Sequence, residues 1–160
     1  MAKKKVAKKA LAKKAPAKKT AVSLKKEALG CFTNMQTIYF ATVDGKKPCL
    51  RPVTLIRYAR KFWIATGTKD AKTKQIKKNG NIEFCLMLPK GKNLGYLRCA
   101  GTAKIVASKK TKMQVAKGIP YLKEHWKKGV DDPNFTLLEI KPKRAEYMRP
   151  GEYLADKFAL

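Results

Sequence analysis

The feature that most constrains the fold is a succession of β-branched and aromatic runs joined by very short connections. Residues 36–43 (QTIYFATV) lead into Asp44-Gly45, a dipeptide typical of tight hairpins, and the chain returns through residues 48–58 (PCLRPVTLIRY). A basic turn near Ala59 and Arg60 precedes a third run, residues 61–66 (KFWIAT). Three strands joined this tightly predict an antiparallel meander.

The rest of the chain adds more strands, with helices at the edges. Asp70 is a plausible N-cap for a helix over 70–79, and Gly101 predicts a bend or bulge in the strand that contains it. Residues 135–148 predict a strand pair or one bent strand. The remaining expected elements are a short helix over 24–35, strands over 81–88 and 95–107, and a helical stretch over 109–128 broken at 118–120. The pattern predicts a mainly β protein with flanking helices, built as a small β-barrel.

Charge divides the chain into a tail and a body. The net charge is +27; residues 1–28 carry eleven Lys and one acidic residue (+10), which leaves +17 for residues 29–160. Residues 1–23 repeat Ala-Lys-Lys with almost no large apolar side chains, so we expect a disordered tail before a domain over 24–160. The tail either contacts a polyanion such as DNA or RNA without sequence preference, or acts only as a solubilising segment. The lysines that would make the contact are Lys3, Lys4, Lys5, Lys8, Lys9, Lys13, Lys14, Lys18 and Lys19.

Several classes of protein are disfavoured by the sequence. No apolar run is long enough for a secretory signal or a membrane span, and a cytoplasmic protein is expected. The four cysteines lack close pairing, which favours buried, reduced thiols over a disulfide or metal framework. His125 is the only histidine, so we expect no metal site, and a surface or helix-packing role for this residue. No phosphate-loop, dinucleotide-binding, zinc-protease or serine-hydrolase motif occurs.

Two segments suggest an anion site. Residues 51–54 (RPVT) place an arginine beside a proline inside a strand, where proline removes a ladder hydrogen bond and forces an edge or a bulge. Residues 66–72 (TGTKDAK) combine hydroxyl groups, an ammonium group and a helix start. Such donors bind phosphate, although any polar loop in a chain this rich in lysine would contain some of them.

These segments also carry a resemblance to a known family. The stretches TIYFATVDGKKPCLRPVTLI, FWIATGTKDAKTKQIKKNGNIEFCLM and LRCAGTAKIV resemble, in order and spacing, the flavin-binding split-barrel family related to pyridoxamine 5'-phosphate oxidase, over about residues 24–148. The resemblance implies a six-stranded antiparallel split β-barrel that forms a homodimer with FMN at the interface. It also implies that Gly101 matches the glycine of a later family strand, and that Asp70 replaces a small hydroxyl residue of the phosphate contact. The implied cofactor-binding residues are Arg51, Pro52, Val53, Thr54, Thr66, Gly67, Lys72 and Gln75.

The sequence and its family resemblance say less about the reaction than about the cofactor. The C-terminal Arg-x-His arrangement by which pyridoxamine-phosphate oxidases recognise their substrate is missing, so that activity is not carried over and no catalytic residue is assigned. Three hypotheses follow: a flavin-dependent oxidoreductase, an FMN-binding protein without turnover, and a basic nucleic-acid-binding module. A deazaflavin or haem in place of FMN stays open. Aromatic residues that could cover a ring, although core packing is their default role, are Tyr39, Phe40, Trp63 and Tyr96.

Overall fold

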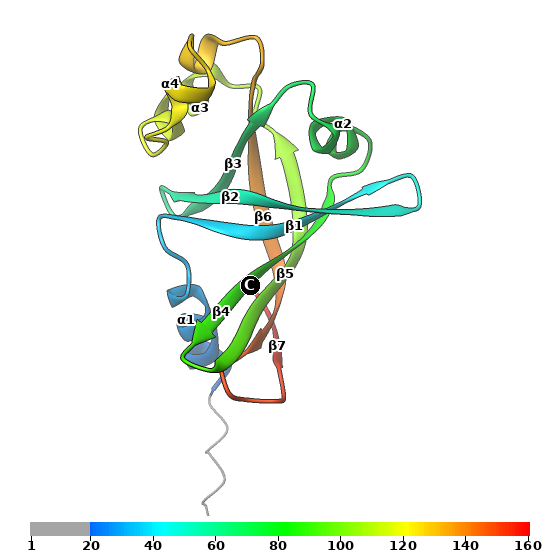
Figure 1. Cartoon of the computed structure of the whole chain (residues 1–160), viewed down its shortest axis with the longest axis vertical. Coiled ribbons are helices and arrows are strands. Elements are labelled where there is room, and N and C mark those ends of the chain that lie inside the picture. The colour runs from blue at the N-terminus through cyan, green and yellow to red at the C-terminus, as the bar shows by residue number, and fades with distance from the viewer. Residues whose placement is uncertain (1–19) are drawn as a thin grey trace, which may run out of the picture.

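Six antiparallel strands close into a barrel, and a seventh short strand extends one edge (Figure 1). The computed structural model describes residues 20–160, so the lysines of the predicted tail lie outside the described residues. The strands are β1 (Met35–Asp44), β2 (Lys47–Tyr58), β3 (Lys61–Gly67), β4 (Asn81–Lys90), β5 (Asn93–Ile105), β6 (Phe135–Met148) and β7 (Asp156–Ala159). The helices are α1 (Ala21–Gly30), α2 (Ala71–Lys78), α3 (Lys109–Ala116) and α4 (Leu122–His125), with a 3-10 turn over Gly129–Asp131.

The predicted meander is confirmed. β1 pairs along its whole length with residues 47–56 of β2, and β2 pairs with β3 through residues 56–58. The hairpin between β1 and β2 turns at Gly45, whose φ of 61° lies in the left-handed region that glycine adopts freely. The tight turn between β2 and β3 uses positive φ at both Ala59 and Arg60.

The sheet order β3-β2-β1-β4-β5-β6 closes because β3 also pairs with β6. β6 is one long strand rather than a strand pair, and it borders β3 only through residues 135–140. Beyond that point β7 pairs with residues 144–147 of β6. The prediction of six strands therefore describes the closed barrel and misses β7, a four-residue segment too short and too polar to stand out in the sequence.

Gly101 marks a bulge, as predicted. The register between β5 and β6 shifts between Ala100 and Gly101. A Cβ atom at Gly101 would overlap the backbone carbonyl of Lys141, so the two strands approach each other more closely than a side chain permits.

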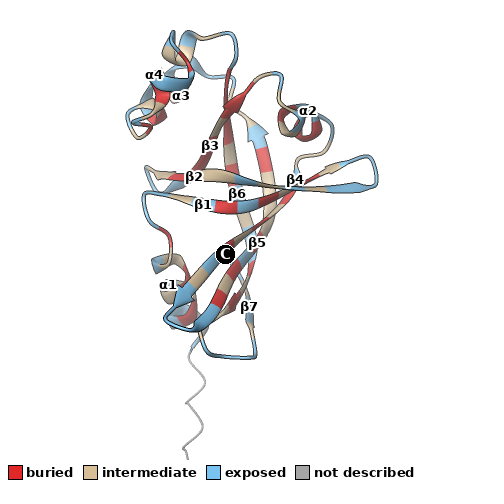
Figure 2. Ribbon diagram, in the orientation of Figure 1, coloured by how far each residue is buried: buried red, intermediate tan, exposed pale blue. Residues whose placement is uncertain are grey.

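The barrel interior is the main hydrophobic core, and buried residues alternate with more exposed ones along strands such as β1 and β4 (Figure 2). In β1, Ile38 and Phe40 are buried while Tyr39 is exposed. Helix α1 packs against the same core through Leu24 and Ala28, four residues apart on one face. This helix begins at Ala21 and ends at Gly30, earlier at both ends than the predicted 24–35.

A second apolar cluster lies on the outer side of β3 and β6. Helix α3 and the segment around α4 cover this side: Val115, Leu122 and Trp126 pack against Trp63 and Leu137. The predicted helical stretch over 109–128 is confirmed as two helices separated at residues 117–121. The α4 segment is thereby held next to the end of β3, where the candidate site lies.

The cysteines correct one expectation. All four are free thiols, but only Cys99 is buried; Cys31, Cys49 and Cys85 are half-buried. Each of these three lies just beyond a helix end or on a partly open strand face, which leaves it partly accessible to solvent. Nowhere in residues 20–160 is there a helix long and apolar enough to cross a membrane.

Candidate functional site

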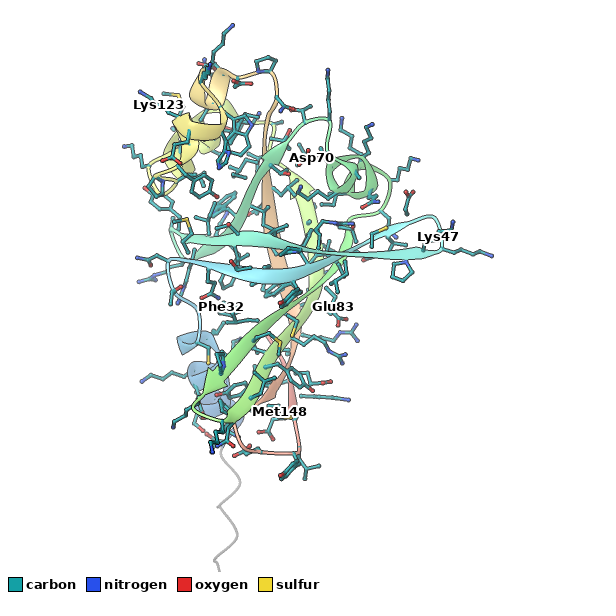
Figure 3. The ribbon with its side chains drawn as sticks, in the orientation of Figure 1. Phe32, Lys47, Asp70, Glu83, Lys123 and Met148 are labelled. Carbon is teal, nitrogen blue, oxygen red and sulfur yellow. The ribbon has the colours of Figure 1, made fainter. Side chains whose placement is uncertain are left out.

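A groove of about 410 Å³ lies where β2, β3, the start of α2 and the α4 segment meet. Its volume falls in the range of small-molecule sites, roughly 300–1,000 Å³. Figure 3 shows Asp70 at the junction of β3 and α2, with α4 nearby. The groove is lined by Pro52, Val53, Thr54, Ala65, Thr66, Gly67, Asp70, Lys72, Tyr121, His125, Trp126 and Asn134.

Six of the eight predicted cofactor residues line this groove. They come from two segments far apart in sequence, 52–54 on β2 and 66–72 at the end of β3 and the start of α2. The other two, Arg51 and Gln75, do not line the groove and contact each other beside it.

β2 has an open edge along the groove. Residues 47–56 of β2 pair with β1 on one side, but β3 pairs only with residues 56–58 on the other. Within the described chain, Pro52 therefore sits on a stretch of strand whose second side has no strand partner, as its missing N–H predicted. The backbone groups along this edge are available to hydrogen-bond a ligand.

Arg51 is held in place by two buried polar side chains. Its Nη1 donates to Thr42 Oγ1 at 2.6 Å and its Nη2 donates to Gln75 Oε1 at 3.2 Å. Thr42 Oγ1 also donates to Gln75 Oε1 at 2.6 Å, and both of these side chains are buried. No ion pair joins Arg51 to a carboxylate within residues 20–160. The guanidinium is thus oriented by neutral groups, and its positive charge has no carboxylate partner among the described residues.

Lys72 lies on the same side of α2 as Gln75. The two residues are three positions apart, and residues at this spacing are neighbours on a helix surface. Gln75 in turn contacts Arg51, whereas the Lys72 ammonium group contacts Asp70. Lys72 lines the groove, and Arg51 lies beside it without lining it.

Asp70 occupies the N-cap position of α2, as predicted, but its carboxylate does not cap the helix. It turns back toward β3, and Oδ2 accepts hydrogen bonds from Thr66 Oγ1 at 2.6 Å, from the Gly67 amide at 3.1 Å and from Lys72 Nζ at 2.7 Å. Partial desolvation opposes ionisation, yet hydrogen bonds from Lys72, Thr66 and Gly67 lower the pKa of Asp70 below its ordinary value.

Three residues with aromatic rings also line the groove, and we call them the aromatic wall: Tyr121, His125 and Trp126. The Trp126 indole donates to the Asn134 carbonyl at 3.1 Å, and its ring packs edge-on against Phe135 at 5.1 Å. The His125 ring lies 5.6 Å from that of Tyr121. Burial raises the pKa of Tyr121 above its ordinary value, against the effect of a hydrogen bond with Thr54.

The sequence interpretation missed this wall. His125 is exposed, as expected of a surface histidine, but it also lines the groove. None of the four aromatic residues suggested as ring covers lines it: Phe40 and Trp63 are buried in the two cores, Tyr39 is exposed, and the Tyr96 hydroxyl donates to Glu146. The only local signal for the wall is the four-residue spacing of Tyr121 and His125, which places them on one helical face.

Comparison with known proteins places this architecture in a family. A family model described as pyridoxamine 5'-phosphate oxidase matches residues 24–149. The chain belongs to the pyridoxamine 5'-phosphate oxidase family. Its strands have the antiparallel split-barrel arrangement seen in solved members of the family's fold.

Proteins that are similar to this chain carry several names. General stress protein 26 of Bacillus subtilis is 29% identical over 130 residues, which is 81% of this chain and 91% of the relative. The crystal structure of a nimC/nimA family protein from Clostridium acetobutylicum is 24% identical with a TM-score of 0.69, covering 84% of this chain and 91% of that one. A heme binding protein from Mycobacterium smegmatis is 13% identical with a TM-score of 0.67, covering 88% of this chain and 59% of that one. The similarity to the two solved structures shows the shared fold.

Proposed function

We propose that this member of the pyridoxamine 5'-phosphate oxidase family binds a flavin in the groove, with FMN as the form implied by the sequence resemblance, and acts as a flavin-dependent oxidoreductase. The observation that carries the proposal is the joint placement of an open strand edge, an aromatic wall and Lys72 along one groove, with Arg51 held beside it. An aromatic, partly anionic ligand satisfies all three features at once.

The residues present fit a flavin. The open edge of β2 offers backbone donors and acceptors for the polar rim of a ring system, and Tyr121 and Trp126 give it an apolar face. Arg51 and Lys72 supply positive charge for a phosphate. Asp70 is the one discordant group, because it brings negative charge to the same end of the groove.

A bound flavin supplies the hydride and electron transfer, and this chain supplies binding and orientation. Arg51 and Lys72 would hold the phosphate end of the flavin, and the backbone of Val53 and Thr54 would hold the polar rim of its ring system. Trp126, itself buried, keeps water from one side of the groove. Such a site requires no protein acid or base for hydride transfer, consistent with the lack of a catalytic motif in the sequence.

We also propose that the protein acts as a homodimer. Exposed apolar side chains gather on the outer side of the sheet, where Tyr39 pairs with Pro52 on β2 and with Cys85 on β4. Met87 and Leu50 extend this exposed surface. Pro52 also lines the groove, so a second copy seated here would cover the open side of the cofactor site. Sedimentation at micromolar concentration tests the dimer, and a strictly monomeric protein would contradict it.

Titration with FMN, followed by flavin fluorescence and absorbance, tests the binding proposal. We expect saturable binding by the wild-type protein and weaker binding by Arg51→Ala. Anaerobic addition of NADH or NADPH to the complex then separates an oxidoreductase from a binding protein without turnover, because reduction bleaches the flavin. Failure to take up FMN or riboflavin would overturn the proposed function.

Haem is a second candidate ligand, favoured by one observation. The only histidine of the chain, His125, is exposed and lines the groove, and imidazole is a frequent axial ligand of haem iron. Haem titration of the wild-type protein and of His125→Ala distinguishes the two ligands. A Soret shift lost in His125→Ala favours haem, and one that is unchanged argues against an iron ligand at this position.

For the basic tail we propose a non-specific contact with DNA or RNA. Nine lysines and no acidic residue occur within residues 1–19. Neutralisation of phosphates by lysine gives an affinity that falls steeply with salt. This contact is separate from the groove and is tested by truncation below.

A further inference from the structure

The carboxylate of Asp70 is surrounded by the kind of donors that bind an anion. A hydroxyl group, a backbone amide and an ammonium group all point at one oxygen, Oδ2, from distances of 2.6, 3.1 and 2.7 Å. Three donors that converge on one oxygen are a typical arrangement for a phosphate oxygen as well as for a carboxylate. Here the protein's own side chain fills that place.

The backbone beneath Asp70 is shaped for this contact. A Cβ atom at Gly67 would lie 2.7 Å from Asp70 Oδ1, which is closer than carbon and oxygen normally approach. Gly67 therefore lets the carboxylate lie directly over the end of β3. The Lys72 side chain is only 16% exposed, so most of its surface is already committed to this contact and to the packing of α2.

We propose that Asp70 is a resident anion in the phosphate-binding end of the groove, and that it weakens the preference of the groove for a ligand that carries a phosphate monoester over the same ligand without one. For flavins the inference rests on the proposed function. It then means that Asp70 reduces the preference for FMN over riboflavin that Arg51 and Lys72 would otherwise create.

Two physical effects weaken the preference for the ligand that carries the phosphate. A phosphate oxygen can reach Thr66, Gly67 and Lys72 only after Asp70 has given up three hydrogen bonds. A carboxylate that stays in place repels the phosphate, since like charges at close range disfavour each other. The Asp70 side chain is 44% exposed and has room to rotate into solvent, so the phosphate is disfavoured rather than excluded. Arg51, which has no carboxylate partner among the described residues, then becomes the main phosphate contact.

Two variants remove the resident charge in different ways. Asp70→Asn keeps the size of the side chain, and Asp70→Ser shortens it and restores a residue that caps helices well. Dissociation constants for FMN and riboflavin are measured by fluorescence at one salt concentration near pH 8, where a phosphate monoester is a dianion. We expect the preference for FMN over riboflavin to rise about tenfold in both variants. Asp156→Asn, which removes an exposed carboxylate on β7, is the matched control and should leave the preference unchanged.

An unchanged or lower preference for FMN in both Asp70 variants would overturn the inference. Thermal unfolding of each variant confirms that it is folded, and riboflavin binding provides an internal check on the groove, because riboflavin lacks the phosphate. If one variant loses affinity for both FMN and riboflavin, its groove is damaged. The preference measured in the other variant then decides whether the inference holds.

A measurement without flavin keeps this inference separate from the proposed function. Inorganic phosphate should raise the melting temperature of Asp70→Asn more than that of the wild type, and adding Lys72→Gln to Asp70→Asn should remove the gain. If no variant binds any flavin, the proposed function fails and the phosphate measurement alone decides the inference. Equal stabilisation of wild type and Asp70→Asn by phosphate would overturn it.

Discussion

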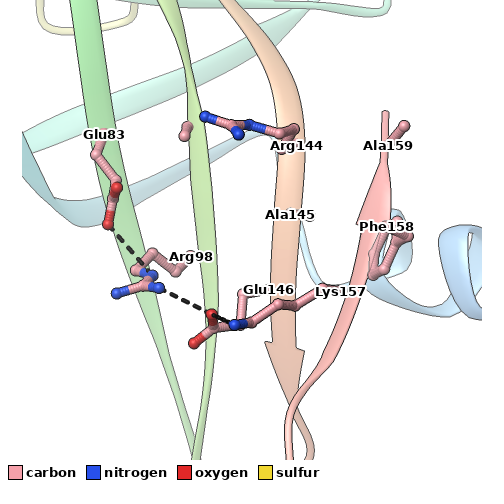
Figure 4. Close-up of a pocket in the computed structure, with 9 residues that line it drawn as sticks. Glu83, Arg98, Arg144, Ala145, Glu146, Lys157, Phe158 and Ala159 are labelled. Carbon is pink, nitrogen blue, oxygen red and sulfur yellow. Dashed lines mark hydrogen bonds and ion pairs between the residues drawn. The ribbon is translucent and has the colours of Figure 1, made fainter.

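Two hollows of similar size on the same barrel differ in how their charges are arranged. The groove measures about 410 Å³, and a second hollow, which we call the charged hollow, measures about 460 Å³ on the outer side of β4, β5, β6 and β7. Figure 4 shows the charged hollow, with Arg98 bridging Glu83 on one neighbouring strand and Glu146 on the other. The two hollows have similar volumes, so the difference between them must lie in the side chains that line them.

In the charged hollow, most of the charges already have partners. Arg98 lies 3.2 Å from Glu83 and 2.8 Å from Glu146, and Lys157 lies 3.5 Å from Glu146. These ion pairs link side chains on four adjacent strands, β4, β5, β6 and β7, and stabilise the packing of those strands. Arg144 is the exception, since no ion pair joins it to a described carboxylate, but it is exposed and no described hydrogen bond orients it.

Beside the groove, a cation without a carboxylate partner among the described residues is held firmly, whereas Lys72 in the groove is paired with Asp70. Arg51 donates to two buried side chains, Thr42 and Gln75, that carry no charge. A fixed and uncompensated guanidinium recognises a ligand, whereas a paired or freely moving one stabilises the fold or is solvated. Our proposal of a binding site at the groove therefore rests on charge compensation and side-chain order rather than on size.

The largest expected effect comes from removing the ordered arginine. Arg51→Ala should weaken FMN binding by about 1.5–3 kcal/mol, the worth of a charge-assisted phosphate contact, and should weaken riboflavin binding much less. Flavin fluorescence titration measures both. Arg144→Ala in the charged hollow is the matched control and should change neither. Equal losses of FMN and riboflavin in Arg51→Ala would mean that the phosphate lies elsewhere, and a loss in Arg144→Ala would break the comparison.

The next effect is a loss of stability in the charged hollow. Glu146 is 14% exposed and accepts from Tyr96 at 2.6 Å as well as from Arg98. Glu146→Gln should lower the free energy of unfolding by about 1 kcal/mol, because its partners are partly solvated and recover water contacts. Urea denaturation measures this loss. FMN affinity should be unchanged, and a lower affinity would show that the charged hollow is coupled to the groove.

A smaller effect of the same residue depends on pH. The hydrogen bond from Tyr96 lowers the pKa of Glu146 below its ordinary value, and Arg98 and Lys157 add to this shift. The folded protein then holds the proton less tightly than the unfolded chain, so the stabilisation is present at neutral pH and is lost as the pH falls through the folded pKa. The stability difference between wild type and Glu146→Gln should shrink between about pH 6 and about pH 3. A constant difference over this range would contradict the role of the ionised carboxylate.

The fold was predictable where local signals agreed. The Asp44-Gly45 turn and the alternation of buried and exposed residues in β1 specify the meander without any long-range information. β7 has no such signal, because its four residues form a strand only where β6 extends beyond β3. Closure of the barrel through β3 and β6 likewise depends on residues about 70 positions apart in sequence.

The site was predictable only in part, for a similar reason. Arg51 and Lys72 were indicated by their residue types beside an interrupted strand and a helix start. The aromatic wall was not indicated by the sequence, because the position of Trp126 near β2 depends on the packing of the second apolar cluster. Asp70 satisfies the local rule for a helix cap, and only the nearby Thr66 hydroxyl and Lys72 ammonium show why its carboxylate turns the other way.

The smallest expected effect on the groove comes from removing the tail. Deletion of residues 1–19 leaves α1 intact, including Leu24 and Ala28, which pack against the barrel core. FMN affinity should therefore be unchanged, whereas DNA affinity should fall and depend less steeply on salt, because up to nine lysine contacts with phosphates are lost. Titration of labelled duplex DNA at several salt concentrations measures this. If DNA binding survives the deletion with the same salt dependence, the contact lies on the body, whose own excess of positive charge then becomes the surface to search.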